Sequence, residues 1–456
     1  MRLVSRTSLY LLLTGFLLVI ITLVNIQWRT ISEFQHFANV LNDTFNDIAV
    51  FDGENSSSLL VDSAGDITSI HNLTGDELLK VKHAVNCEGR RAEFNVGQRG
   101  EYVVFYNFVK ATKSFGCHES VTFTAPADYT FLDNLPTLVE RWKGPVSVAL
   151  YAPGDDFEVT LKSIAYIRHC LPNSFDDIRD LVTFHVFFHQ QHVPKQKNNR
   201  PLIDAYTDTY TCDGPAPYKN VHPKDTYRRK HDLLFPINVA RNTARQSAQT
   251  HYVFAADIEL YPSVNFIPKF MKMLSVHPEH VRGTRPRIYV LPIFEIGDTK
   301  HVPENKTELQ AKLKTGKAQL FHKRICASCH AIPNLTQWEK QMETEDLDVF
   351  TIGKRVGKHR VWEAFYVGTK EDPLFDERYS WEGQGNKMSQ GFAMCLLDYD
   401  YMILNNAFII HKPGIKHSKE QVKSFAKEVR KSDAMLKQVT KPMLISIYGD
   451  RKGCFL

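Results

Sequence analysis

The sequence contains 456 residues, of which 43% are hydrophobic, so it is long enough to exceed one ordinary domain. Its formal net charge of +5 is modest for this length. That charge argues against a nucleic-acid-binding protein and favours a soluble domain that binds anionic ligands.

The N-terminal segment predicts a membrane anchor. Residues 7–28 contain no charged side chain, and a helix over them, at about 1.5 Å per residue, can cross the hydrocarbon core of about 30 Å. A cleaved signal peptide is the alternative, but no small-residue cleavage site follows. Arg2 and Arg6 precede the span and Arg29 alone follows it closely, which predicts a cytoplasmic tail over residues 1–6. We therefore expect a single-pass type II protein.

Residues 29–86 are polar and acidic, which predicts a luminal stem, with a small N-terminal subdomain as the alternative. The chain carries five Asn-x-Ser/Thr sequons and an even number of cysteines, both compatible with an oxidising lumen. Sequence does not give the pairing of the cysteines. The sequons begin at Asn42, Asn55, Asn72, Asn305 and Asn334, and the cysteines are Cys87, Cys117, Cys170, Cys212, Cys326, Cys329, Cys395 and Cys454.

From residue 87 to residue 456 apolar runs alternate with amphipathic segments, which predicts an α/β domain. No Pro/Gly/Ser-rich linker divides this part, so we expect one large domain with insertions. The clearest predicted strands cover residues 102–109, 146–152, 181–189, 251–257 and 287–295. The basic segment 412–441 has apolar residues at helical spacing, which predicts a packed amphipathic helix.

The stretch HYVFAADIELYPS, residues 251–263, ends a predicted strand in two carboxylates. Asp257 and Glu259 point to the same side of an extended chain, so both can reach one ion, while Ile258 points into the core. Mg²⁺ and Mn²⁺ commonly use such carboxylates together with substrate phosphates. The alternative is the polar end of an ordinary strand.

Four polar residues share one face of the preceding predicted helix, at spacing i, i+3, i+4 and i+7. This face could offer guanidinium groups to a diphosphate or to an acidic sugar, or it could simply face solvent. The four residues are Asn238, Arg241, Asn242 and Arg245. We expect the nearby run 227–231 to be exposed to solvent.

The motif CASCH, residues 326–330, fits three interpretations. It matches a haem attachment motif, half a zinc site, or cysteines in structural disulfides. No second Cys or His pair at zinc spacing lies nearby, and haem attachment does not belong to a secretory lumen. We expect disulfides.

Two separated blocks carry a family resemblance. Residues 235–263 and 361–416 resemble the signature regions of the glycosyltransferase family that includes the animal β-1,4-glucuronyltransferase and the C-terminal domain of the LARGE enzymes. The first block has an Asn, an Arg-Asn pair and an Ala on a helix, followed by a strand that closes in an acidic pair and a proline. The matching pieces of the second block are Trp362-Glu363, Phe375-Asp376-Glu377-Arg378, Gly385-Asn386-Lys387, Asn406-Ala407-Phe408 and His411.

The resemblance implies a GT-A fold, with a Rossmann-like nucleotide-binding half, Golgi residence and inverting transfer from a UDP-sugar. It places Asp257 and Glu259 at the metal motif, where Glu259 departs from the usual Asp, and it makes His411 the third ligand. An imidazole ligand favours Mn²⁺ over Mg²⁺, although another divalent cation is possible. The residues expected to bind the UDP-sugar donor are Asn238, Arg241, Asn242 and Asp257.

Inverting transfer needs a carboxylate as general base for the acceptor hydroxyl. Three candidates lie together in the second block. Asp376 is our first choice because its position is acidic in both branches of the family, followed by Glu377 and Glu382. Glu382 departs from the pattern of the family, because its loop is one residue longer than is usual there.

We therefore expect a Golgi type II enzyme that transfers a sugar, first of all glucuronic acid, from a UDP-sugar to a glycan on a glycoprotein. The alternatives are a β-1,3-N-acetylglucosaminyltransferase and a pseudoenzyme that binds glycans without transfer. A homodimer is implied by the resemblance alone, and no nucleic-acid partner is expected.

Overall fold

The structure is a computed structural model, and it describes residue 71 and residues 73–89, 91–171, 175–195, 212–297, 301–415 and 425–456. The predicted tail (1–6), the predicted anchor (7–28) and most of the predicted stem lie outside these residues. Among the helices that are described, none has both the length and the apolar character needed to cross a bilayer.

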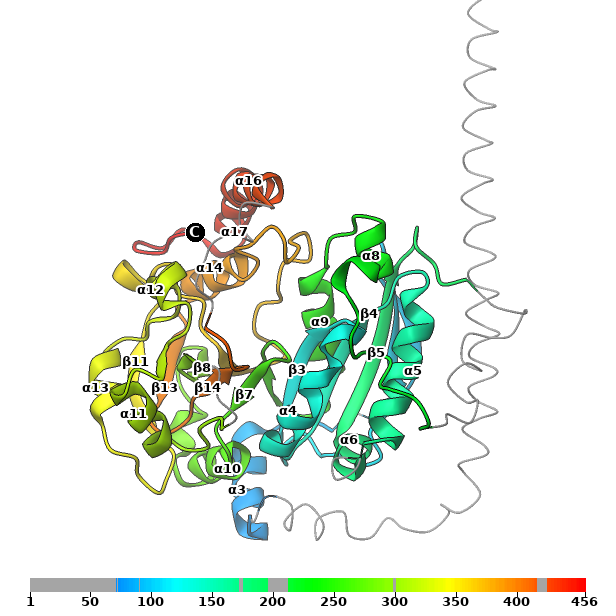
Figure 1. Cartoon of the computed structure of the whole chain (residues 1–456). Coiled ribbons are helices and arrows are strands. Elements are labelled where there is room, and N and C mark those ends of the chain that lie inside the picture. The colour runs from blue at the N-terminus through cyan, green and yellow to red at the C-terminus, as the bar shows by residue number, and fades with distance from the viewer. Residues whose placement is uncertain are drawn as a thin grey trace, which may run out of the picture. The chain divides into compact units, whose positions relative to one another are not determined.

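Four parallel strands in the order β5-β4-β3-β6 form a block inside a ten-stranded sheet. Their side chains are largely buried, as expected for parallel strands covered on both faces. Figure 1 shows this parallel block in cyan to green, with β3, β4 and β5 beside α4, α5, α6 and α9. The strands are β3 (Val121–Ala127), β4 (Val146–Tyr151), β5 (Val182–His189) and β6 (Tyr252–Ala255), and the helices are α4 (Leu135–Trp142), α5 (Asp156–His169), α6 (Phe175–Leu181) and α9 (Ile237–Ser247).

The sheet continues on both sides of this parallel block. Its full order is β1-β2-β5-β4-β3-β6-β12-β8-β13-β11, and β12 runs antiparallel to both of its neighbours. The added strands are β1 (Asn95–Arg99), β2 (Tyr102–Val109), β8 (Arg287–Val290), β11 (Val349–Gly353), β12 (Tyr366–Thr369) and β13 (Asp400–Leu404). The α/β class is therefore confirmed, with a large mixed central sheet.

A second sheet has the order β10-β9-β14-β7. Its strands are β7 (Leu260–Pro262), β9 (Ile293–Ile296), β10 (Ala318–Leu320) and β14 (Ile409–His411). The prediction of one strand over residues 287–295 is wrong, because β8 ends at Val290 and β9 starts in this other sheet. Pro292 lies at the break, where a residue without an N–H cannot continue the ladder.

The remaining helices surround the two sheets. They are α3 (Gly75–Val85), α8 (Tyr227–Lys230), α10 (Phe266–Val276), α11 (Lys306–Lys314), α12 (Lys323–His330), α13 (Leu335–Lys340), α14 (Met388–Leu396), α16 (Ala426–Met435), a π-helical turn (Leu436–Thr440) and α17 (Lys441–Tyr448). Short 3₁₀ helices cover Tyr129–Asn134, Pro223–Asp225, Pro278–His280 and Gly357–His359.

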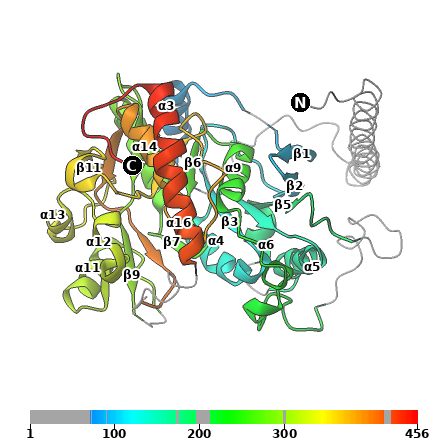
Figure 2. The same ribbon diagram turned by 90° about the horizontal axis from the view of Figure 1, so that it is seen from above.

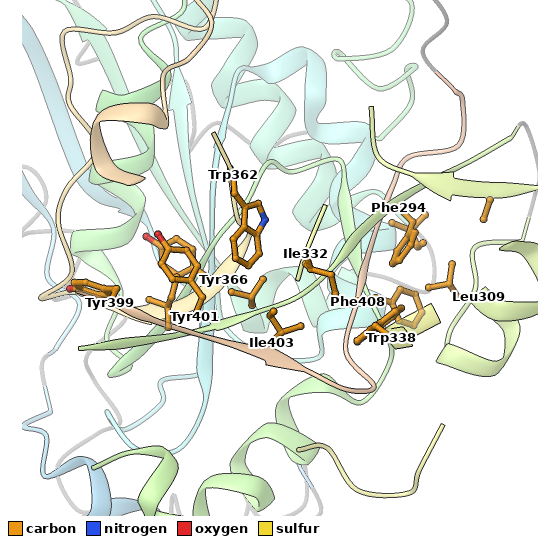
Figure 3. Packing of buried hydrophobic residues seen from close by; sticks show 14 of the residues in the cluster. Phe294, Leu309, Ile332, Trp338, Trp362, Tyr366, Tyr399, Tyr401, Ile403 and Phe408 are labelled. Atoms are coloured by element: carbon orange, nitrogen blue, oxygen red, sulfur yellow. The ribbon is translucent and has the colours of Figure 1, made fainter. Parts of the chain in front are cut away.

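A hydrophobic cluster joins the two sheets in the half that follows β6. Trp338 is fully buried, its indole Nε1–H donates to the Leu404 carbonyl at 2.8 Å, and its ring stacks on Phe294 at 5.6 Å. Trp362 packs on Tyr401 with ring centroids 5.1 Å apart. Figure 3 shows these side chains as one continuous layer. The layer holds in place the chain that leads into β12.

Helix α3 lies within the predicted stem but packs on the folded domain. Its capping box pairs Thr74 with Glu77, and its apolar residues Leu78 and Val81 are buried, where the helix contacts α10. Arg282 also donates a hydrogen bond to the His83 carbonyl at 2.8 Å. The globular part therefore includes residues that precede Cys87.

The predicted helix over residues 412–441 is found in part. Residues 416–424 lie outside the described residues, and α16, the π-helical turn and α17 follow, with Leu436 buried. Helix α17 contacts α14. Seen from above, α16 crosses the region between the two halves of the molecule (Figure 2).

All eight cysteines form disulfides. The bond inside CASCH confirms the disulfide interpretation for these two cysteines. The pairs are Cys87–Cys117, Cys170–Cys212, Cys326–Cys329 and Cys395–Cys454.

Candidate functional site

The topology places a ligand crevice at the carboxyl end of β6. Strands β3, β4 and β5 follow one another to one side, and β6 returns to the other side of β3, so the strand order reverses between β3 and β6. Open α/β sheets bind ligands at such a switch point. The Ala256 N–H donates to the Thr124 carbonyl at 3.1 Å, which fixes the chain immediately before Asp257.

A cavity of about 320 Å³ lies at this point. Five of the residues predicted from the sequence line it, and they come from four separate segments of the chain. These residues are Arg241, Asp257, Glu259, Glu382 and His411.

Asp257 is a carboxylate held between positive charges. Its Oδ1 accepts a hydrogen bond from Nη2 of Arg241 at 3.0 Å, and the Arg241 side chain is only 4% exposed. Burial raises the pKa of Asp257, but the charges of Lys387, Arg241 and His411 and the hydrogen bond from Arg241 lower it to about 2. The carboxylate is therefore ionised throughout the physiological pH range.

His411 and Glu259 meet at the edge of the second sheet, where β14 pairs with β7. Nδ1 of His411 lies 2.8 Å from the Lys412 carbonyl oxygen, and Nε2 lies 3.2 Å from Oε1 of Glu259. A carbonyl oxygen only accepts, so Nδ1 carries a proton. Nε2 then faces a carboxylate and either carries a second proton or offers a lone pair to a cation. Metal-binding histidines in proteins commonly have this arrangement.

Two carboxylates and one imidazole are a donor set that suits Mn²⁺. The three side chains do not form one cluster, because Asp257 bonds to Arg241 whereas Glu259 bonds to His411. Among the described residues, two groups of potential ligands have atoms within 4.8 Å of one another, and neither includes these three. The residues fit a divalent cation by chemistry and by the orientation of His411, and their role as ligands stays a prediction.

The polar face of α9 is neither exposed nor, apart from Arg241, part of the cavity. Asn238 donates to the carbonyls of Asp376 and Asn386, both at 2.8 Å. Asn242 donates to the Phe375 carbonyl at 2.8 Å and accepts from the Phe375 N–H at 3.1 Å.

Arg245 extends the same contact, because its guanidinium donates to the carbonyls of Thr369, Asp372 and Pro373. The α9 face therefore holds the segment 369–387 in place. This geometry indicates a structural role for Asn238 and Asn242 rather than the predicted contact with the donor.

Two of the three candidate bases do not line the cavity. The carboxylate of Asp376 accepts from Nε and Nη2 of Arg378 at 2.8 and 2.6 Å. Glu377 forms an ion pair with Arg99 and accepts from Asn242 at 2.7 Å. Both carboxylates are occupied by donors that compete with a substrate proton.

Glu382 lines the cavity, but its carboxylate is occupied as well. Oε1 accepts from Nη1 of Arg228 at 2.9 Å, and Oε2 accepts from the Phe235 N–H at 2.9 Å. The side chains of Glu382 and Arg228 are 0% and 12% exposed. The expectation that residues 227–231 face solvent is therefore wrong for Arg228.

Two cavity residues that carry a carboxylate or an ammonium group were not predicted as part of the site. They are Lys387 and Glu363, which both line the cavity. Both belong to the matching pieces of the second signature block, but the resemblance gave neither of them a role. Nζ of Lys387 lies 3.6 Å from the centroid of the Phe365 ring. Burial lowers the pKa of Lys387 to about 8, against the opposing effects of Asp257 and Glu363. The sequence signal for Lys387 is its charge directly after the glycine-containing loop 381–386, and Glu363 carries no comparable local signal.

The segment around CASCH forms a further wall of the cavity. Both cysteines of the Cys326–Cys329 disulfide line it, and so does His330, which is buried. Burial lowers the pKa of His330 to about 3, so this imidazole is neutral. The Phe321 ring stacks on His411 with centroids 5.3 Å apart, which fixes the plane of that imidazole.

Comparison with known proteins identifies the family. The family described as "Glycosyl-transferase for dystroglycan" matches residues 120–449. Beta-1,4-glucuronyltransferase 1 of Danio rerio is 27% identical over 332 residues, which is 69% of this chain and 72% of that protein. The human protein of that name is 27% identical over 70% of this chain and 73% of its own length.

The human xylosyl- and glucuronyltransferase LARGE1 is 22% identical over 72% of this chain, and the match covers 35% of that larger protein. The match to the family includes all the predicted cavity residues. This chain therefore belongs to the dystroglycan glycosyltransferase family and is a glycosyltransferase.

Proposed function

We propose that the protein is an inverting transferase of the GT-A fold that moves glucuronic acid from UDP-glucuronate to a glycan on a glycoprotein. One observation carries this proposal: the cavity at the switch point brings Asp257, Arg241 and Lys387 together. Nucleoside diphosphates bind at such points, and a doubly anionic diphosphate next to an acidic sugar needs positive charge around it. The names of the relatives support glucuronate as the sugar.

The chain's own residues define what the site can do. Asp257, Glu259 and His411 would hold a divalent cation, which supplies Lewis-acid neutralisation of the diphosphate as it leaves. Arg241 orients the Asp257 carboxylate through its hydrogen bond, and Asn386 holds Arg241 by accepting from Nη1 at 2.6 Å. The network fixes Asp257 before any ligand arrives, which lowers the cost of ordering the site.

Lys387 is the residue that we expect to bind the carboxylate of the donor sugar. Its ammonium forms no hydrogen bond or ion pair with the part of the chain that the structure describes. Replacing Lys387 by Met is expected to raise KM for UDP-glucuronate by about 10- to 100-fold, because one charged hydrogen bond is lost. K387R retains the charge and should lose less.

The test is a panel of UDP-sugars supplied to the purified full-length protein with and without Mn²⁺. We expect turnover of UDP-glucuronate, and KM for it should rise above about pH 8, where Lys387 loses its proton. The exposed Lys358 serves as a control, since K358M should change nothing. Equal losses for all donors in K387M would assign Lys387 to the diphosphate instead.

Other outcomes of the panel separate the alternatives. Turnover of UDP-N-acetylglucosamine alone would favour the N-acetylglucosaminyltransferase. No turnover of any donor, together with retained binding of glycans, would favour the pseudoenzyme.

We also propose that the domain lies in the Golgi lumen behind an N-terminal anchor. The four disulfides support an oxidising compartment. Asn334 begins a sequon, is exposed and caps no helix with its side chain, whereas both amide atoms of Asn305 bond to Glu308. We expect N334Q, and not N305Q, to remove one glycan in a peptide N-glycosidase mobility assay. A chain from animal cells whose mobility the glycosidase leaves unchanged would contradict luminal placement.

A further inference from the structure

The acidic side chains that line the cavity differ in whether they have partners. Asp257 bonds to Arg241, Glu259 bonds to His411, and Glu382 bonds to Arg228 and to the backbone. The fourth is Glu363. Its carboxylate forms no hydrogen bond or ion pair with any described residue.

The backbone of Glu363 is nevertheless held firmly. Its N–H donates to the Cys329 carbonyl at 2.8 Å, and it follows Trp362, which is buried against Tyr401. Two residues later, the Phe365 carbonyl accepts from the Leu291 N–H at 3.0 Å. An unpaired carboxylate on a fixed backbone is prearranged for a partner that is not part of the chain.

The sheet register places Glu363 beside the metal motif. Strand β12 runs antiparallel to β6 with Val367 opposite Phe254, so the residues that precede β12 lie next to those that follow β6. Glu363 lies three residues before β12 and Asp257 lies two residues after β6, so both belong to segments that meet these paired strands at the same end. Both line the same cavity, and Lys387, which also lines it, is influenced by the charges of both.

We propose that Glu363 is the general base of the transfer reaction. Its carboxylate takes the proton of the acceptor hydroxyl while that oxygen forms a bond to the anomeric carbon of the donor. The bond from that carbon to the diphosphate oxygen breaks, and its electron pair leaves with UDP. The proton passes from Glu363 to solvent, so the carboxylate is restored. This assignment rests on the proposed function and replaces Asp376, which Arg378 occupies.

The experiment compares Glu363→Gln, Glu363→Asp and wild type in transfer from UDP-glucuronate. We expect E363Q to lower kcat by about 10²- to 10⁴-fold, the range for a lost general base. UDP affinity in Mn²⁺ should stay within about twofold of wild type, because the base binds the acceptor side. E363D should recover part of kcat. Glu371, which is exposed in the turn after β12, provides the control E371Q with unchanged kcat.

Each result decides one question. If wild type turns over no donor, the proposed function itself fails and the assignment of Glu363 fails with it. If wild type is active and E363Q keeps more than about a tenth of kcat, only the assignment of Glu363 is overturned. Loss of UDP binding in E363Q, in proportion to the loss of kcat, would also overturn it. If Asp376 is the base, D376N rather than E363Q shows the loss of kcat.

Discussion

Substituting Asp257 by Asn is expected to lower kcat by about 10³-fold or more, because it removes one negative charge from the donor set of a divalent cation. The carboxylate is ionised in the folded chain, with the pKa of Asp257 lowered to about 2, so the substitution removes a full charge at every working pH. Increasing Mn²⁺ should restore little of the activity. The measurement is kcat as a function of Mn²⁺ concentration for both proteins.

The asparagine keeps an oxygen that can accept from Arg241, so D257N should fold. Its unfolding midpoint in urea is the control, and it should match wild type closely. Activity within tenfold of wild type would contradict a role for Asp257 at the reaction centre.

Substituting Glu382 by Ala is expected to destabilise the fold by about 3 kcal/mol, because the buried Arg228 guanidinium loses its hydrogen-bonded carboxylate and keeps only the Asp128 oxygen at 3.9 Å. The side chain of Glu382 is 0% exposed and that of Arg228 is 12% exposed, so solvent screens this pair little. The substitution also leaves the Phe235 N–H without its acceptor. Urea unfolding of E382A, compared with wild type, measures the loss.

Two further variants serve as comparisons for the loss of stability in E382A. E382Q keeps a hydrogen-bond acceptor and should lose less than E382A. The surface pair of Glu158 and Lys162 is half exposed on the lysine side, and E158Q should cost less than about 0.5 kcal/mol. An E382A protein with wild-type stability and no turnover would show that Glu382 acts in catalysis instead.

Most strands of the parallel run β5-β4-β3-β6 could be predicted because parallel strands buried on both faces are continuous apolar runs. The runs at β2, β4, β5 and β6 were found within about two residues. The apolar pattern of RIYVLPIFE predicts one strand, although its proline signals the break that the structure shows between β8 and β9. Strands β3 and β12 are short or rich in small residues and carried less of this signal.

The position of Asp257 could also be predicted, because it depends on the end of one strand. Its neighbour Lys387 could not, because it ends the loop 369–387, whose path is fixed by α9. Polar residues at spacing i, i+3, i+4 and i+7 give the same sequence pattern whether the helix face contacts solvent, a ligand or a buried backbone. The structure shows that Asn238, Asn242 and Arg245 bind backbone carbonyls.

The same limit applies to the acids. Glu377 and Glu382 could not be assigned by sequence, because each pairs with a cation that lies far away along the chain, whereas the cation that occupies Asp376 is Arg378, two residues on. Arg228 is 154 residues from Glu382, and Arg99 is 278 residues from Glu377. Once these pairs are known, the unpaired Glu363 becomes the most informative carboxylate of the cavity.

Calorimetric titration of UDP into the purified full-length protein, in Mn²⁺ and in EDTA, tests most directly whether this cavity is a metal-dependent nucleotide site. We predict binding in Mn²⁺ that is at least about tenfold tighter than in EDTA, which is about 1.4 kcal/mol. D257N and H411A should both abolish that difference. Equal affinity in Mn²⁺ and EDTA, or a wild-type response from D257N, would contradict the account.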